Sequence, residues 1–160
     1  MNLLNVIKEK ARAYAPEVVR LRRHIHQHPE LSYQEFKTAE LVRSELTKLG
    51  LQPKTMATTG VVAEIQGKNP QKKTVALRAD MDALPIQEQN DVPYKSVYPG
   101  VMHACGHDVH TASLLGTAKI LSDLRNEFEG TVRLIFQPGE EKNPGGASLL
   151  IKEGALQNPV

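Results

Sequence analysis

Residues 131–141, TVRLIFQPGEE, contain the segment that indicates the fold most directly. Thr131–Gln137 is short and has a nearly continuous apolar centre, which is typical of a strand buried on both faces of a sheet. Pro138 and Gly139 then break the pattern and predict a loop. Because both faces of such a strand must be covered, the segment favours a sheet packed between layers of helices.

The patterns before and after this strand alternate between strand and helix. Residues 61–66 and 74–79 are short β-type runs, separated by the turn-forming stretch GKNPQKK. Helical patterns cover five ranges: 3–13, 16–28, 36–49, 108–124 and 145–153. This alternation predicts an α/β fold whose sheet is covered on both faces.

Particular residues predict where the helices begin and end. Pro16 suits a first helical turn, so residues 3–28 are expected to form two helices, the second closed by Pro29. Ser32 and Glu35 match a capping box for the next helix. Gly50 stands where that helix should stop.

Length and composition exclude several classes of protein. A chain of 160 residues is one ordinary domain, and 40% hydrophobic with 24% charged residues describes a globular protein. A net charge of +2 is too small to indicate nucleic-acid binding, and the cluster Arg20, Arg22 and Arg23 is interpreted as a solvated helix face. One cysteine, no signal-peptide pattern and no apolar run of membrane length favour the cytoplasm and argue against a membrane.

Residues 100–110, GVMHACGHDVH, gather three histidines around the single cysteine. Three explanations compete: a metal site, a cysteine nucleophile with a histidine base, or a coincidence on a buried turn. Cys105 and His107, two residues apart on irregular backbone, can both reach one cation. The triplet alone is a weak signal, since a buried structural cysteine is the more frequent case.

Two pairs of carboxylates follow predicted strands. Glu140 and Glu141 come directly after Thr131–Gln137, and Asp80 and Asp82 come at the end of the 74–79 run. Each pair alone is explained by a solvated helix start or an Asp-rich turn. However, ligands bind at the carboxyl ends of strands in such sheets, and three polar segments are expected there together.

The remaining histidines lie in the predicted helix 16–28. His24 and His28 share a face and could hold a metal, whereas His26 points elsewhere. Helix capping and packing is favoured over ligation for all three.

Four ordered motifs carry a resemblance to a known family: RRHIHQHPELSYQE, ALRADMDALPIQE, MHACGHDVHTA and RLIFQPGEEKNPGGA. Together they resemble the metal-dependent N-acyl-amino-acid amidohydrolases, the branch of co-catalytic metallopeptidases that holds hippurate hydrolases, auxin-conjugate hydrolases and N-acetyldiaminopimelate deacetylases. The resemblance implies a three-layer α/β/α zinc-peptidase-like catalytic domain with a mostly parallel or mixed sheet. Residues 1–160 would be the N-terminal part of that domain, which is incomplete in this chain.

The resemblance also implies roles for residues. Cys105 and His107 match the first two metal ligands, Glu141 the carboxylate ligand, Glu140 the general base and Asp82 the carboxylate that supports the site. Three further positions are secondary: Asp80 is not expected to be a main ligand, and His103 and His110 are assigned packing or hydrogen bonding near the site.

By the same resemblance, the complete enzyme binds two divalent ions (Mn²⁺, Zn²⁺, Co²⁺ or Ni²⁺), hydrolyses small N-acyl amino acids and forms a dimer or tetramer. Family members are much longer, and two further histidine ligands and a lid domain lie outside residues 1–160, so little activity is expected of this chain alone. Two alternatives stay open: a cysteine hydrolase using Cys105 with His107 or His110 as its base, and a non-catalytic fragment that binds metal or a partner.

Overall fold

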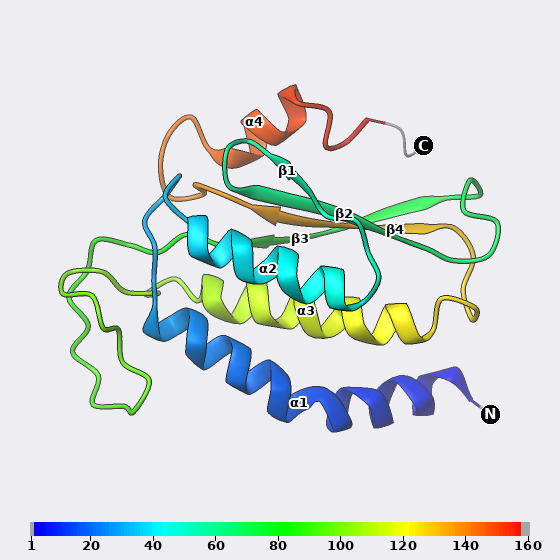
Figure 1. The fold of residues 1–160 in the computed structure, drawn as a ribbon, viewed down its shortest axis with the longest axis horizontal. Helices are drawn as coiled ribbons and strands as arrows, with labels where there is room; N and C mark the ends of the chain where they lie inside the picture. The colour runs from blue at the N-terminus through cyan, green and yellow to red at the C-terminus, as the bar shows by residue number, and fades with distance from the viewer. Residues whose placement is uncertain (1, 158–160) are drawn as a thin grey trace.

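The computed structural model describes residues 2–157, and its elements alternate as expected (Figure 1). The helices are α1 (Leu3–Gln27), α2 (Phe36–Lys48), α3 (His107–Asp123) and α4 (Gly146–Lys152). The strands are β1 (Lys54–Met56), β2 (Gly60–Gln66), β3 (Thr74–Asp80) and β4 (Thr131–Gln137). The three longer strands and helices α2, α3 and α4 agree with the sequence prediction to within one or two residues, whereas the three-residue strand β1 was not predicted.

The strands form one mixed sheet in the order β1-β2-β4-β3. β3 and β4 run parallel because the crossover through α3 joins them, whereas β2 runs antiparallel to both β1 and β4. β4 therefore lies between two strands that precede it in the sequence. Its nearly continuous burial agrees with the apolar centre of its sequence.

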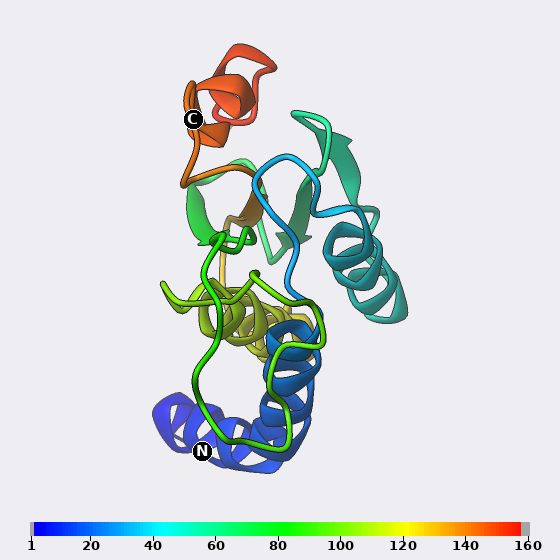
Figure 2. The same ribbon diagram turned by 90° about the vertical axis from the view of Figure 1, so that its left-hand side faces the viewer.

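Helices cover both faces of the sheet (Figures 1 and 2). α2 and α3 pack on one face, with α1 beneath α3, and their side chains form the larger core cluster with alternate residues of β2 such as Val61 and Ile65. α4 covers the other face, where Leu150 packs with Val62 and Ile135. The three-layer α/β/α fold with a mixed sheet is confirmed.

The prediction of two helices over residues 3–28 is wrong. α1 is one helix with Pro16 inside it, and Figure 1 shows a bend near its middle. Proline removes one helical hydrogen bond, but α1 packs along α3, where Val18 lies so close to Gly116 that a β-carbon there would collide with it. This packing offsets the missing bond and keeps the helix continuous.

The predicted capping box at the start of α2 is also wrong. Ser32 and Glu35 make no capping bonds with each other because both side chains bind distant segments: Ser32 Oγ donates to Asp82 Oδ2 at 2.6 Å, and Glu35 accepts from Gly139 N at 2.8 Å. The Glu30 carboxylate caps the helix instead, accepting from the backbone N–H groups of Lys37 and Thr38 at 3.1 and 2.8 Å.

A long irregular segment, residues 81–106, connects β3 to α3 and packs against the C-terminal end of α1 (Figure 2). Val97 N donates to Gln27 O at 3.0 Å, and Leu84 and Met102 exchange two backbone hydrogen bonds within the segment. Segments of this length without secondary structure are uncommon in compact domains and are usually functional.

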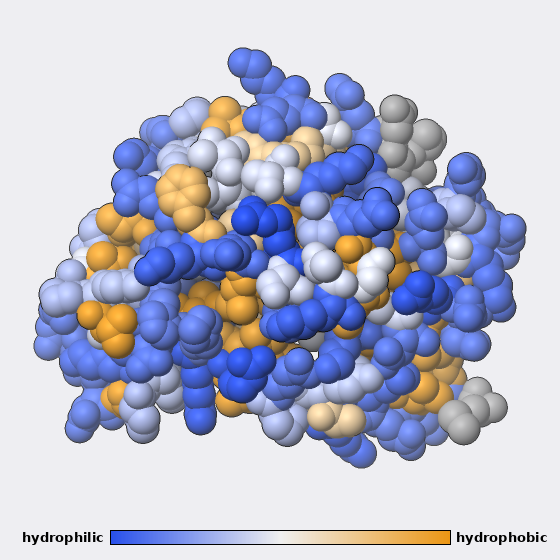
Figure 3. Space-filling view, viewed as in Figure 1, coloured by the Kyte–Doolittle hydropathy of each residue, from blue (hydrophilic) through white to orange (hydrophobic). Residues whose placement is uncertain are grey.

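Polar residues cover most of the face shown in Figure 3, with apolar residues in separate patches between them. None of the helices in residues 2–157 is long and apolar enough to cross a membrane.

Candidate metal centre

Three segments that are far apart in the sequence meet at one edge of the sheet. β3 and β4 are parallel, so the carboxylates that follow them lie side by side, and α3 begins beside both. Gly106, between Cys105 and His107, adopts a left-handed conformation (φ 88°) that is strained for other residues. This turn lets the thiol and the imidazole approach the same point.

His107 is buried, with 2% of its surface exposed, and its orientation is fixed through one ring nitrogen. Nδ1 lies 2.9 Å from the Asp82 backbone oxygen and 3.2 Å from Asp82 Oδ1. Both of these oxygens accept hydrogen bonds, so Nδ1 carries the proton and Nε2 keeps its lone pair. A metal-binding histidine is usually held in this way, by a carboxylate or carbonyl on its other nitrogen.

The free Nε2 of His107 faces three carboxylates. It lies 3.7 Å from Asp80 Oδ1, 3.8 Å from Glu141 Oε1 and 3.9 Å from Glu140 Oε2. Lone pairs and negative charges that converge in this way repel one another unless a proton or a cation lies between them.

Asp82, which follows β3, forms hydrogen bonds with the start of α3 and with the loop after β4. Its Oδ2 accepts hydrogen bonds from Ser32 Oγ and from the backbone N–H of Glu141, at 2.6 and 3.0 Å. Burial would raise the pKa of this carboxyl, but the hydrogen bonds from His107, Ser32 and the backbone of the Glu140–Glu141 loop outweigh it and hold the pKa well below its usual range. Asp82 is therefore ionised when it orients His107.

Cys105 completes a set of three donor groups. Its thiol, a ring nitrogen of His107 and a carboxylate oxygen of Glu141 all lie within 4.8 Å of one another. The hydrogen bond to Glu141 raises the pKa of the thiol, and burial and the neighbouring carboxylates raise it further. A divalent cation would replace the thiol proton and cancel this repulsion, and a thiolate, an imidazole and a carboxylate are suitable ligands for Zn²⁺, Mn²⁺, Co²⁺ or Ni²⁺. The residues present fit a metal ion.

Asp80 and His110 form a second group around the same imidazole. His110 Nδ1 lies 2.5 Å from Asp80 Oδ1, and its ring stacks on that of His107 with centroids 5.6 Å apart. Asp80, His107 and His110 also bring three donor atoms within 4.8 Å of one another. Arg78 pairs with Asp80 at 3.0 Å and compensates part of its charge.

The other histidines lie outside these groups. His103 is buried, its two ring nitrogens have no hydrogen-bond partner among the described residues, and burial lowers its pKa to about 4. His28 Nδ1 contacts the backbone oxygen of His24 at 2.8 Å, and the two rings lie 4.6 Å apart at the end of α1. His26, the residue with the weakest sequence signal, is the one that reaches the segment before α3, through Glu88 and Asp108.

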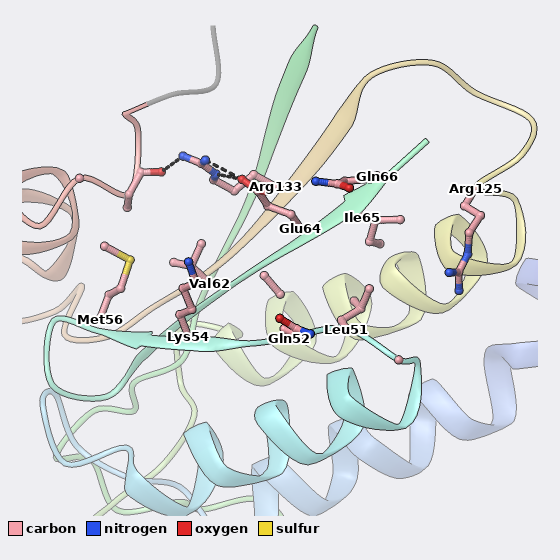
Figure 4. Close-up of a pocket in the computed structure, with 14 residues that line it drawn as sticks. Leu51, Gln52, Lys54, Met56, Val62, Glu64, Ile65, Gln66, Arg125 and Arg133 are labelled. Carbon is pink, nitrogen blue, oxygen red and sulfur yellow. Dashed lines mark hydrogen bonds and ion pairs between the residues drawn. The ribbon is translucent and has the colours of Figure 1, made fainter. Parts of the chain in front are cut away.

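A cavity of about 690 Å³ lies elsewhere, beside the part of β2 that β1 does not cover (Figure 4). It is lined by Leu51, Lys54, Ile65 and their neighbours, and Glu64 and Arg133 at its rim pair with each other at 2.6 Å. None of the candidate metal or acid–base residues lines it. The cavity is therefore separate from the candidate metal centre at the sheet edge.

Comparison with known proteins identifies relatives of this chain. The sequence pattern of Peptidase family M20/M25/M40 matches residues 76–160. The N-acyl-L-amino acid amidohydrolase of Geobacillus stearothermophilus is 52% identical over 141 residues, which cover 88% of this chain and 38% of that protein. IAA-amino acid hydrolase ILR1-like 5 of Arabidopsis thaliana is 50% identical over 143 residues, covering 88% of this chain and 32% of that protein.

A solved structure shows the same fold. The Bacillus subtilis YXEP protein, described as a dinuclear metal binding peptidase from the M20 family, superposes with a TM-score of 0.86 at 45% identity over 91% of this chain and 41% of that one. The chain thus spans well under half the length of the proteins it matches. More than half of the chain matches the family pattern, and the matched range holds both carboxylate pairs, the thiol and His107. This chain belongs to Peptidase family M20/M25/M40.

Proposed function

We propose that this chain carries part of the catalytic centre of a metal-dependent amidohydrolase that cleaves the amide bond of N-acyl amino acids, giving a carboxylate and a free amino acid. The convergence of the Cys105 thiol, His107 Nε2 and the Glu141 carboxylate, with Glu140 beside them, is the observation that carries the proposal. The names of the relatives supply the substrate class, since they act on N-acyl and IAA conjugates of amino acids.

Cys105, His107 and Glu141 are the ligands in this proposal. A divalent ion held there would act as a Lewis acid, polarising an amide carbonyl and making water a stronger acid. We propose two ions in the complete site, as in the dinuclear structural relative, with Mn²⁺, Zn²⁺, Co²⁺ and Ni²⁺ as candidates.

Glu140 moves the proton in the proposed reaction. Its side chain is 41% exposed, so it can reach substrate and water, while its Oε2 lies 3.9 Å from His107 Nε2. The carboxylate accepts the proton of the attacking water and returns it to the leaving nitrogen, a role that typically contributes about 10²–10⁴-fold to the rate. Asp82 keeps His107 in the required tautomer and does not touch the substrate.

The cysteine-hydrolase alternative is disfavoured by electrostatics. A nucleophilic cysteine needs a lowered thiol pKa, usually from a cationic neighbour. The hydrogen bond with Glu141 and the adjacent carboxylates instead raise the pKa of Cys105. Activity that survives complete removal of metal by a chelator would support this alternative.

Paired substitutions test the proposal in a full-length protein that contains residues 1–160. We expect Glu140→Gln to retain metal and lose most of kcat for N-acetyl and N-benzoyl amino acids, because an amide cannot accept and return a proton. Glu141→Gln should instead lower the metal content. If both variants lose metal equally and keep kcat per bound ion, this assignment of base and ligand is wrong.

Two properties of the whole protein belong to the same proposal. An exposed thiol must stay reduced to bind metal, which favours the cytoplasm. The family resemblance implies a homo-oligomer, a dimer or tetramer, which light scattering on the full-length protein tests. The alternative of a non-catalytic fragment predicts that residues 1–160 bind metal or a partner without turnover, which size-exclusion chromatography beside an activity assay tests.

A further inference from the structure

His26 lies in α1 with 4% of its surface exposed and uses both ring nitrogens to contact carboxylates. Nδ1 is 2.8 Å from Asp108 Oδ2, and Nε2 is 3.0 Å from Glu88 Oε1. Arg22 Nη2 also lies 3.4 Å from Nδ1, so the ring, one arginine and two carboxyl groups form one polar cluster beneath the surface. The imidazole thus bridges two buried carboxyl groups.

The two carboxylates anchor the two ends of the irregular segment before α3. Glu88, 2% exposed, lies near its start and also accepts from the backbone N–H of Ser96 at 2.7 Å. Asp108, with no exposed surface, follows His107 in the first turn of α3. His26 therefore holds both ends of the segment that carries Cys105 against α1. We call the three residues His26, Glu88 and Asp108 the clamp.

Two arginines of α1 reinforce the clamp. Arg22 Nε lies 2.7 Å from Asp108 Oδ2, and the guanidinium groups of Arg22 and Arg23 lie over the ring of Tyr94, within the same segment, at 5.0 and 4.9 Å. The prediction that these arginines form only a solvated helix face is wrong for Arg22.

Cys105 depends on this clamp more than His107 does. His107 is held directly by Asp82, whereas Cys105 is exposed and lies in the irregular part of the chain. His103, two residues before it, is buried beside His26, with ring centroids 6.4 Å apart. Removing the ring costs Glu88 and Asp108 one buried contact each, although Arg22 stays paired with Asp108, so the segment between the two carboxyl groups is held less firmly.

We propose that His26 is a positioning residue of the metal centre: by bridging Glu88 and Asp108 it holds the segment that places the Cys105 thiol beside His107 and Glu141. The inference rests on the proposed metal-dependent function. According to this inference, α1 contributes no metal ligand but controls the position of the thiolate ligand, Cys105.

Co²⁺ is the probe for the test, because a cobalt–thiolate bond gives a charge-transfer absorption in the near ultraviolet that reports Cys105 directly. The chain is titrated with Co²⁺ as wild type, His26→Gln, Glu88→Gln and the control His28→Gln. His28 is also near the end of α1 but contacts neither carboxylate of the clamp. Circular dichroism at the titration temperature establishes that each variant is folded.

We expect His26→Gln to bind Co²⁺ roughly tenfold more weakly, the lower end of the range for groups that orient metal ligands, with a reduced thiolate band at saturation. Glu88→Gln should show a smaller change in the same direction, and His28→Gln should match the wild type. A loss of melting temperature alone would not change the band of the folded, saturated protein.

The outcomes separate the two proposals. A thiolate band in the wild type that is unchanged in folded His26→Gln and Glu88→Gln overturns the role of His26 and leaves the metal centre intact. No band in the wild type overturns the metal centre and this inference with it. If His26→Gln does not fold, the milder Glu88→Gln decides, with unchanged affinity overturning the clamp.

Discussion

Glu35 holds the loop that carries the two candidate glutamates. The residue has no exposed surface, and its Oε1 accepts from the backbone N–H groups of Tyr33 and Gly139 at 2.9 and 2.8 Å, while Oε2 accepts from Thr59 Oγ1 at 2.5 Å. Gly139 has a positive φ of 52°, and a β-carbon there would collide with the ring of Tyr33. The backbone that leads to Glu140 is thus fixed by one buried carboxylate and one ring.

Burial of Glu35 has a consequence for the dependence of stability on pH. Burial raises its pKa above the ordinary value of 4.5, although its hydrogen bonds oppose the shift. A carboxyl whose pKa is raised in the folded state contributes stability below the unfolded-state pKa, and this contribution is lost as pH rises through the folded-state pKa. The ionised carboxylate is therefore a cost to the fold at neutral pH.

We expect Glu35→Gln to gain stability relative to the wild type as pH rises above about 4.5. The amide keeps an oxygen for the N–H groups of Tyr33 and Gly139 and can donate to Thr59 in place of accepting from it. Urea midpoints measured between pH 4 and pH 8 give the difference, with the exposed Glu40→Gln as control. A constant difference across this range would show that the burial of Glu35 does not shift its titration.

Cys105→Ser tests the thiolate at the scale of a single ligand. We expect lower metal content by elemental analysis and loss of sensitivity to oxidants, because serine is a poor replacement for a thiolate and the exposed thiol is the oxidisable group. Metal content equal to that of the wild type would remove Cys105 from the ligand set.

At the scale of elements, α2 begins at a cap supplied from outside the helix. The Glu30 carboxylate accepts from Lys37 N, Thr38 N and Thr38 Oγ1, and its negative charge faces the positive end of the helix dipole. We expect Glu30→Ala to lower the free energy of unfolding by about 1–2 kcal/mol, the upper range for a lost N-cap. Glu40→Ala on the exposed face of α2 is the control and should change it little, as measured by urea denaturation.

The same elements show which parts of the fold could be predicted. Periodicity predicted β2, β3, β4, α3 and α4 because local patterns encode them. The candidate site residues directly follow strands or precede α3, and this position predicted that they meet at one edge of the sheet. Local signals failed where distant contacts decide: Pro16 stays helical because α1 packs on α3, and Ser32 turns to Asp82. The contacts of His26 with two carboxyl groups could not be predicted from its helical position, since these partners are 62 and 82 residues away.

At the scale of the whole molecule, β3 is an edge strand. Among the described residues it pairs only with β4, and Val75 on it is 45% exposed. Unpaired strand edges promote association with other chains, and charged residues suppress it. We expect the chain to self-associate through this edge, and we expect Val75→Lys to reduce that association in analytical ultracentrifugation. Val19→Lys, equally exposed at 45% but on α1, is the matched control, and an equal effect of both would point to surface charge and not to the strand edge.

The two candidate donor groups limit what residues 1–160 can do alone. Both groups, Cys105–His107–Glu141 and Asp80–His107–His110, use His107, and its single free nitrogen can bind only one ion at a time. The two groups therefore cannot both hold an ion with all three of their donors. We expect the chain alone to bind at most one ion per molecule by elemental analysis after dialysis. We also expect hydrolysis of N-acetyl or N-benzoyl amino acids to fall at least ~10²–10³-fold below a full-length relative, because the resemblance places two ligands and the lid domain outside residues 1–160 and the loss of even one group that stabilises the transition state costs this much. Mixing with a fragment that covers the rest of a full-length relative should restore part of the rate, because the two parts of the sheet edge would then meet.

Two tightly bound ions, or efficient metal-dependent turnover by the chain alone, would show that Asp80 and His110 form a second site without His107.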